Sequence, residues 1–214
     1  MTDVLSRDGL WAAIRTERGA LADDLAGLGP DDWARPSLCG AWTVEEVVAH
    51  LTAAASIGRW AWIRSMLGAR FDPDVHNARR LAEHRGATPA ETLQRFRAVV
   101  DRDTAASGHT AAWLGEVVVH AQDVRRPLGI AHTFPVGSLT AVAAFFASRN
   151  FAVASGTVAK HLRLEATDGP FTAGDGPVVS GPTLALVMVM AGRRAYLDDL
   201  TGRGVATITQ RLDD

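Results

Sequence analysis

Two capping boxes in the first half of the chain mark where helices begin, and they restrict the folds open to it. In a capping box, a Ser or Thr hydroxyl accepts a hydrogen bond from the backbone N–H three residues later, and a Glu there reaches back to the capping residue. Thr43 and Glu46 form one such pair, and Thr88 and Glu91 form another. Pro89 occupies the first helical position after Thr88, where a missing N–H costs nothing. The first half therefore contains at least two well-defined helix starts.

Apolar residues through the first 150 positions recur at the three- and four-residue spacing of helices. Gly29-Pro30 ends the first of these patterns, and Ser107-Gly108 ends a later one. The expected helices cover 5–28, 43–68, 88–107, 110–126 and 138–151, with a charged and partly helical stretch at 71–85. Short connections between such helices are typical of a helical bundle. We expect residues 1–152 to form a helical-bundle domain.

The pattern changes after about residue 156. The stretch 161–167 alternates polar and apolar residues, which predicts a strand, and Asp168-Gly169 predicts a turn. The further expected elements are short strands at 171–173 and 178–179, a helix at 180–192, a helical turn at 194–200 and a last strand at 205–208. The fold class is therefore mainly α, with a small α+β domain at 153–214. A tail of that size is expected to lean on the bundle.

Composition excludes several classes of function. The 214 residues carry a formal net charge of −2, and no Lys/Arg cluster is backed by aromatic residues, so nucleic acid is not expected as a partner. The apolar runs are shorter than the roughly 20 residues of a membrane span, and the N-terminus has no signal pattern. A single cysteine, Cys39, favours a reducing cytoplasm. All but one of the 22 basic residues are Arg, which suggests a GC-rich genome such as that of an actinomycete.

The stretch from Gly115 to Pro127 combines a carboxylate and an imidazole with a run of valines. In a helix, Glu116 and His120 lie one turn apart on one face, whereas in a strand they would be about 13 Å apart. Three valines in succession favour a strand locally, but helical neighbours and Pro127 favour a helix here. A carboxylate among valines is unfavourable unless something pairs with it. A bound metal ion is one such partner, and an ordinary surface salt bridge is the alternative.

A second histidine, His50, lies between Val47 and Leu51 on another expected helix. In helical bundles, metal sites are built from inward side chains on facing helices. Two histidines and one carboxylate match the ligand sets of catalytic zinc and of facial-triad iron, both of which leave positions open for substrate. His50, Glu116 and His120 are therefore the candidate ligands. For His50 alone, a hydrogen-bonded core histidine is the competing interpretation.

Several motifs resemble one known family. The first motif is Cys39-Gly40-Ala41-Trp42-Thr43-Val44 with Ala49-His50-Leu51, and the second runs from Gly115-Glu116 through His120-Ala121-Gln122-Asp123-Val124-Arg125-Arg126-Pro127-Leu128-Gly129. The tail adds Gly174-Asp175-Gly176-Pro177, Ser180-Gly181-Pro182 and Ala191-Gly192-Arg193-Arg194. Together they resemble the actinobacterial type of the mycothiol-dependent maleylpyruvate isomerase family, within the DinB-like metal-binding superfamily. The resemblance implies a DinB-like four-helix bundle and a small C-terminal domain that is sterol-carrier-protein-like.

The resemblance also implies a cofactor and a co-substrate. A divalent metal, usually zinc, would bind to His50, Glu116 and His120 with water completing its shell, and mycothiol would be the thiol. A divalent cation stabilises a bound thiolate, which can add to or displace a group on a small electrophile. The expected activity is that of an isomerase or a thiol S-transferase. Because the isomerase substrate is an anion, Arg193 and Arg194 are the candidate catalytic cations. The thiol and the electrophile are the expected partners, for a monomer or a homodimer.

Other interpretations stay open on the sequence alone. The metal could be structural in a non-catalytic binding protein, whose C-terminal domain binds a ligand or a partner. The chain could also be a metal-dependent hydrolase, with zinc-bound water as the nucleophile. Cys39 is interpreted as a structural thiol rather than a nucleophile. Asp123 could orient a ligand histidine or pair with Arg126, and the sequence does not choose between these.

Overall fold

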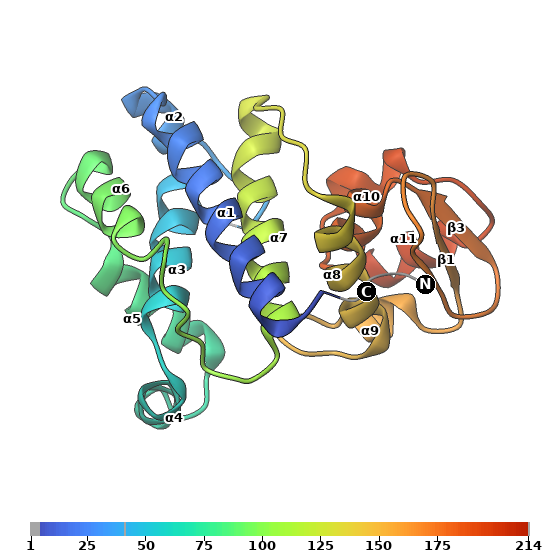
Figure 1. Cartoon of the computed structure of the whole chain (residues 1–214), viewed down its shortest axis with the longest axis horizontal. Coiled ribbons are helices and arrows are strands. Elements are labelled where there is room, and N and C mark those ends of the chain that lie inside the picture. The colour runs from blue at the N-terminus through green and yellow to red at the C-terminus, as the bar shows by residue number, and fades with distance from the viewer. Residues whose placement is uncertain (1–4, 41, 214) are drawn as a thin grey trace. The chain divides into compact units, whose positions relative to one another are not determined.

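The computed structural model describes residues 5–40 and 42–213, which form a mainly helical protein with one small sheet (Figure 1). By their contacts, these residues group into two compact units. We call Trp11–His132 the bundle unit, and we call residues 5–10 together with 133–213 the C-terminal unit. The expected fold class, a helical bundle with a small α+β part, is confirmed.

The bundle unit is entirely helical apart from its connections. Its elements are α1 (Arg7–Ala26, from Trp11 on), α2 (Pro30–Trp33), α3 (Val44–Ser56), α4 (Arg59–Gly68), α5 (Pro73–His84), α6 (Pro89–Arg97) and α7 (Thr110–Leu128). Helix α3 is central, because it packs against α5 and α6 on one side and against α7 on the other (Figure 1). Helix α1 is tied to α7 by an ion pair between Asp24 and Arg125, with 2.7 Å between the carboxylate and Nε.

Both expected helix starts are confirmed by their hydrogen bonds. Thr43 Oγ1 accepts from the N–H of Glu46 at 3.3 Å, and Glu46 Oε2 accepts from the N–H of Thr43 at 2.8 Å. Thr88 Oγ1 accepts from the N–H of Glu91 at 3.2 Å. The Glu91 carboxylate, however, accepts from the N–H of Ala87 at 2.8 Å. In the second cap, the Glu91 side chain thus bonds to Ala87 rather than to Thr88, the residue that the sequence pattern predicts.

The helix expected over 43–68 is in fact two helices. Helix α3 ends at Ser56, Ile57 has an extended backbone with φ −114° and ψ 119°, and Gly58 caps the start of α4. A β-branched residue followed by glycine is a weak point in a helix. Apolar residues keep helical spacing on both sides of the break, so periodicity alone cannot reveal it. The break redirects the chain toward α5, against which α4 packs.

Two other helix ends differ from expectation. Helix α6 ends at Arg97, well before Ser107. Helix α7 continues through Pro127 to Leu128 and ends at Gly129, whose φ of 68° is the left-handed C-cap conformation that glycine adopts easily. Proline interrupts only one backbone hydrogen bond, and near the last turn this is tolerated. The expected helix over 110–126 is therefore confirmed, with a slightly later end.

The C-terminal unit combines helices with a three-stranded sheet. Its elements are α8 (Val136–Ser148), α9 (Ser155–Ala159), β1 (Arg163–Ala166), β2 (Thr172–Ala173), β3 (Val178–Gly181), α10 (Thr183–Met190), the 3-10 helix η1 (Arg194–Asp199) and α11 (Val205–Asp213). The strand order is β2-β1-β3, with β1 antiparallel to β2 and parallel to β3. Helix α10 packs against β1 and β3, and almost all of its side chains are buried.

One expected strand of this unit is wrong. Residues 205–208 begin helix α11, in which Ile208 is buried and Thr209 Oγ1 donates to the carbonyl of Val205 at 3.0 Å. Arg211 anchors the helix by donating to the carbonyl of Val158 at 2.7 Å. The short apolar run was ambiguous between strand and helix, and the tertiary contacts select the helix.

Helix α8 packs against α9 and α10 of the C-terminal unit. In the sequence-based division, residues 136–148 fall within the bundle domain of 1–152. The contacts thus begin the C-terminal unit at Thr133. The division into domains of residues 1–152 and 153–214 therefore stays a prediction.

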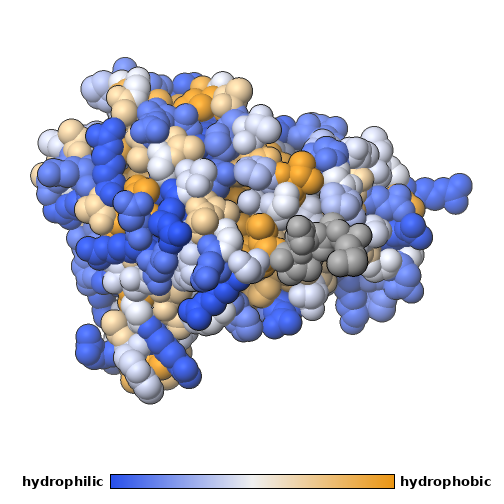
Figure 2. Space-filling model, viewed as in Figure 1, coloured by the Kyte–Doolittle hydropathy of each residue, from blue (hydrophilic) through white to orange (hydrophobic). Residues whose placement is uncertain are grey.

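The surface is that of a chain with mixed polarity. The face in Figure 2 is mostly hydrophilic, with small separate hydrophobic areas. Among the described residues, none of the helices combines the length and the apolar character that crossing a membrane requires.

Candidate metal centre

Helices α3 and α7 bring the three predicted ligands together. His50 lies in the second turn of α3, and Glu116 and His120 lie one turn apart on α7. Glu116 Oε1 lies 2.8 Å from His50 Nε2 and 3.7 Å from His120 Nε2. One donor atom from each of the three residues fits within a 4.8 Å cluster. Two imidazoles from different helices thus present the same ring nitrogen to one carboxylate oxygen.

These separations fit a single small cation. In tetrahedral zinc sites, bonds of about 2.1 Å place the ligand atoms roughly 3.4 Å apart. To admit the ion, the His120 pair at 3.7 Å would close slightly and the His50 pair at 2.8 Å would open slightly. Small movements of the ligand side chains would therefore be enough to admit the ion. The donor set of two histidines and a carboxylate therefore fits a divalent metal.

The cluster is shielded from solvent but can be reached from it. The exposed fractions are 14% for the His50 side chain, 19% for Glu116 and 11% for His120. Around them, the apolar residues of both helices are buried: Val47, Val48, Ala49 and Leu51 on α3, and Val117, Val118, Val119, Ala121 and Val124 on α7. Structural zinc sites are closed, whereas catalytic sites keep one position open. His50 and Glu116 remain partly exposed, whereas His120 is buried.

Trp42 forms an aromatic wall beside the cluster. Its ring centroid lies 4.9 Å from that of His50 and 6.5 Å from that of His120, and the two imidazole centroids are 4.9 Å apart. The loop that carries Trp42 is closed by a hydrogen bond from the N–H of Ser37 to the Trp42 carbonyl at 2.9 Å. The Thr43 cap follows at once, so the start of α3 positions this ring.

Asp123 orients the His120 ring. Its carboxylate is fully buried and lies 2.9 Å from His120 Nδ1, one turn along the same helix. A proton on Nδ1 is held by this bond, which leaves the Nε2 lone pair facing Glu116 and available to a metal. Of the two roles that the sequence left open for Asp123, the structure supports the orienting one.

Cys39 lies closer to the site than the sequence suggested. Its thiol is half-buried and hydrogen-bonded to His120, and Cys39, His120 and Asp123 form a second cluster of potential ligand atoms. Its backbone N–H donates to Ser37 Oγ at 3.0 Å, which holds the turn before the α3 cap. The sequence interpretation of a purely structural thiol is therefore incomplete. The signal was its position four residues before a helix N-cap, on a loop that nothing local places near α7.

The electrostatics of the metal-free cluster favour a positive charge. Burial by itself lowers the pKa of His120, but the negative charge of Glu116 and hydrogen bonds to Asp123 and Cys39 outweigh it and raise the pKa to about 10. A proton on His120 thus offsets the negative charge of the two nearby carboxylates, as a bound cation would. A divalent ion bound between the same groups would replace that proton.

The two predicted catalytic cations lie in the C-terminal unit. Arg193 immediately precedes η1, and its Nη1 donates to the carbonyl of Ala191 at 2.6 Å. Arg194 opens η1 and forms an ion pair with Asp213 of α11. Both arginines therefore have bonds within their own unit. Their expected action on an anionic substrate stays a prediction.

Comparison with known proteins adds family and fold. Residues 14–113 match the family model described as the mycothiol maleylpyruvate isomerase N-terminal domain. This span includes His50, Cys39 and Trp42, and it ends just before Glu116. The comparison with curated proteins found no match.

Two solved structures share the fold over nearly the whole chain. A crystal structure of the mycothiol-dependent maleylpyruvate isomerase aligns with a TM-score of 0.63 at 20% identity, covering 93% of each chain. A histidine-to-alanine mutant of that isomerase aligns with a TM-score of 0.64 at the same identity and coverage. At this identity the likeness establishes the common fold, which includes both the bundle and the small α+β part.

Proposed function

Residues 14–113 belong to the mycothiol maleylpyruvate isomerase N-terminal domain family, and on that premise we propose that this chain is a divalent-metal enzyme of thiol chemistry. Its reaction would be the addition or transfer of a low-molecular-weight thiol, mycothiol, to a small electrophile. Isomerisation through reversible addition and S-transfer are the two forms of this chemistry. Zinc is the proposed metal, and the cytoplasm is the proposed location.

One observation carries the proposal. His50, Glu116 and His120 come from two helices and converge within a single ion's reach, and two of them, His50 and Glu116, stay partly exposed. A metal there would lower the pKa of a coordinated thiol, so that the thiolate is available as a nucleophile at neutral pH. A metal ion that only stabilises the fold is usually bound in a closed site, so ligands that solvent can reach favour a catalytic role.

The surrounding residues have separate tasks in this proposal. Asp123 keeps the Nδ1 proton on His120 and thereby keeps Nε2 as the ligand atom. The buried valines of α7 and the ring of Trp42 limit the water around the reacting sulfur. The Cys39 thiol, hydrogen-bonded to His120, adds to the polar wall of the site. Arg193 and Arg194 are proposed to bind an anionic substrate, from a C-terminal domain proposed to be sterol-carrier-protein-like.

Metal analysis of the purified protein is the first test. We expect about one divalent ion per chain, lost in His50→Ala and in Glu116→Ala. His109→Ala is a matched control, because this exposed histidine caps the same helix as Glu116 and lies outside the cluster. Unchanged metal content in the first two variants would rule out the proposed site.

Thiol binding and turnover form the second test. Titration of the metal-loaded protein with mycothiol is expected to give saturable binding that is absent from the metal-free protein. Turnover is then assayed with the thiol and small cis-enedioate or other electrophilic substrates. A loaded protein that binds no thiol would contradict the thiol-transfer proposal. If metal removal lowers the melting temperature and no thiol–electrophile pair reacts, the structural-metal interpretation replaces it.

A further inference from the structure

A polar hollow lies in the bundle unit, apart from the metal ligands. It has a volume of about 350 Å³ and is bounded by the end of α3, one face of α4 and one face of α5. This volume lies within the range of small-molecule sites, near its lower end. Its polar side chains are Ser56, Arg64, Ser65, Arg79, Arg80 and Glu83.

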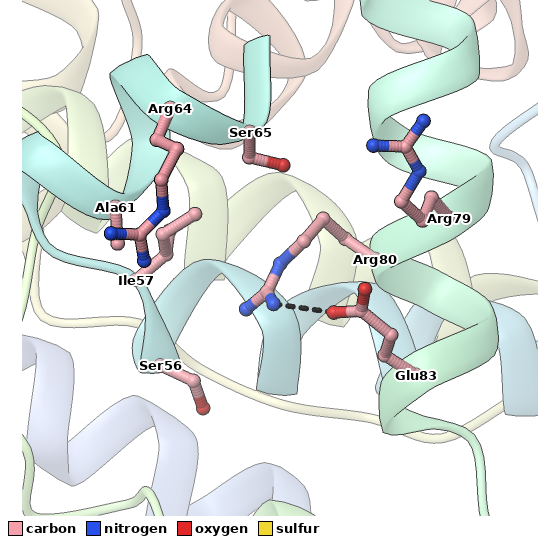
Figure 3. A pocket seen from close by; sticks show the side chains of 8 residues that line it. All are labelled: Ser56, Ile57, Ala61, Arg64, Ser65, Arg79, Arg80 and Glu83. Atoms are coloured by element: carbon pink, nitrogen blue, oxygen red, sulfur yellow. Dashed lines mark hydrogen bonds and ion pairs between the residues drawn. The ribbon is translucent and has the colours of Figure 1, made fainter. Parts of the chain in front are cut away.

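The arrangement follows from the break after α3. Because Ile57 and Gly58 end one helix and start another, α4 turns and packs against α5. Arg64 and Ser65 then lie on the face of α4 that borders the hollow, and Arg80 reaches into it from α5 (Figure 3). A continuous helix over 43–68 would have carried Arg64 away along the α3 axis.

The hollow carries an excess of positive charge. Three arginines line it with a single carboxylate, Glu83, which gives a net charge of +2 from these four groups. Glu83 is paired with Arg80 at 2.6 Å, so it compensates the arginine that is most buried. Arg64 and Arg79 remain exposed at the rim, and Arg79 donates to the carbonyl of Gly68 at 3.4 Å.

The donors of the hollow exceed the acceptors that it offers. Arg80 Nη1 donates to Glu83 Oε2 at 2.6 Å and Nη2 lies 2.8 Å from His84 Nε2, while its buried Nε has no hydrogen-bond partner among the described residues. Ser56 donates its hydroxyl proton to the carbonyl of Thr52 at 2.7 Å. Ser65 Oγ lies 3.0 Å from Nδ1 of His76, a histidine buried behind the hollow. Guanidinium groups with unused N–H donors are suited to carboxylates and other oxyanions, which they can bind through two parallel hydrogen bonds.

His76 reports the positive field of the same region. Burial is the main cause that lowers its pKa, and the charges of Arg80, Arg79 and His50 lower it further, whereas Glu83 acts in the opposite direction. Ser56 follows His50 by six residues on α3, which corresponds to about 9 Å along the helix axis.

We propose that this hollow binds the carboxylate, or another oxyanion group, of a small acidic ligand through Arg64, Arg79 and Arg80. The site requires no metal, and it is an alternative to Arg193 and Arg194 as the place where an acid group is recognised.

Calorimetric titration tests the anion site with two probes, maleate and inorganic phosphate, at physiological ionic strength. Both exposed arginines are removed together in Arg64→Gln/Arg79→Gln, which should leave the fold intact. We expect affinity for the preferred anion to fall about tenfold or more, as for the loss of two charge-assisted bonds. Tighter binding of maleate assigns the site to carboxylate ligands, and tighter binding of phosphate assigns it to phosphate groups.

Two further variants make the test specific. Glu83→Gln removes the one competing carboxylate, so anion affinity should rise. Arg59→Gln is the matched control, because Arg59 is also exposed on α4 but lies over the ring of Trp60 and outside the hollow. Its affinity should equal that of the unmodified protein. No binding of either anion, or an equal loss in Arg59→Gln and in the double variant, would overturn the proposal.

The same experiment separates this inference from the metal proposal. In Glu116→Ala, which should lack metal, the anion affinity and its response to the arginine variants are expected to persist. Metal binding without anion binding would refute the hollow alone. Anion binding in a protein that never takes up metal would refute the metal centre alone.

Discussion

Replacing Asp123 by Asn tests whether this residue positions a metal ligand. Asn is nearly isosteric and can still accept a hydrogen bond from His120 Nδ1, so the ring should stay in place. What changes is the negative charge behind a histidine whose bond to Asp123 is 2.9 Å long and fully buried. The loss of such a partner weakens metal binding about 10- to 100-fold, or about 1.4 to 2.7 kcal/mol.

The assay is competition for zinc between the purified protein and a chelator of known affinity, at fixed pH. Asp24→Asn is the matched control, since Asp24 also pairs with a side chain of α7, the buried Arg125, which is not one of the three ligands. The control should unfold more easily and still hold zinc normally once folded. An Asp123→Asn protein that binds zinc as tightly as the control would refute the positioning role.

Four further predictions concern protons and stability. Because the pKa of His120 is raised to about 10 in the metal-free protein, metal affinity should fall about tenfold per unit as the pH decreases below that value, and calorimetry in several buffers should record about one proton released per ion. Because the pKa of His120 is higher in the folded than in the unfolded protein, protonation of the imidazole stabilises the metal-free fold. This contribution is fully present below the ordinary histidine pKa of about 6.5 and is lost as the pH rises through about 10, which thermal unfolding can follow. Glu45 is buried and pairs with Arg85 at 2.6 Å, so Glu45→Gln should cost about 1–3 kcal/mol in urea unfolding, and no loss would contradict the pairing. At Gly174, with φ 73°, an added Cβ would collide with the carbonyl oxygen of Leu162, so Gly174→Ala should destabilise the protein by about 1–3 kcal/mol while zinc binding by the folded protein is unchanged.

Local chemistry made the helix starts and the ligand spacing predictable. The caps at Thr43 and Thr88 depend on residues three positions apart, and the pairing of Glu116 with His120 depends on one helical turn. Such relations are present in the sequence itself. His50 required one additional assumption, that its helix faces α7, which the contact between α3 and α7 supports.

The features that escaped prediction depend on contacts between distant residues. Ile57 and Gly58 break a helix whose apolar pattern is continuous, because the packing of α4 on α5 decides the direction of the chain. Residues 205–208 become helical through the burial of Ile208. Cys39 reaches His120 only because the loop before α3 folds back to α7.

The two hydrogen-bonding ends of Asp123 have a consequence for how the protein moves. Its carboxylate holds His120, and its backbone carbonyl accepts from the N–H of Leu38 at 3.1 Å. The loop that carries Cys39 and Trp42 is therefore hydrogen-bonded to the same residue that orients the ring of His120. We expect opening of this loop to disturb the orientation of the imidazole as well. Metal occupancy should consequently slow amide hydrogen exchange at Leu38, so that a backbone position outside the ligand set reports the state of the site.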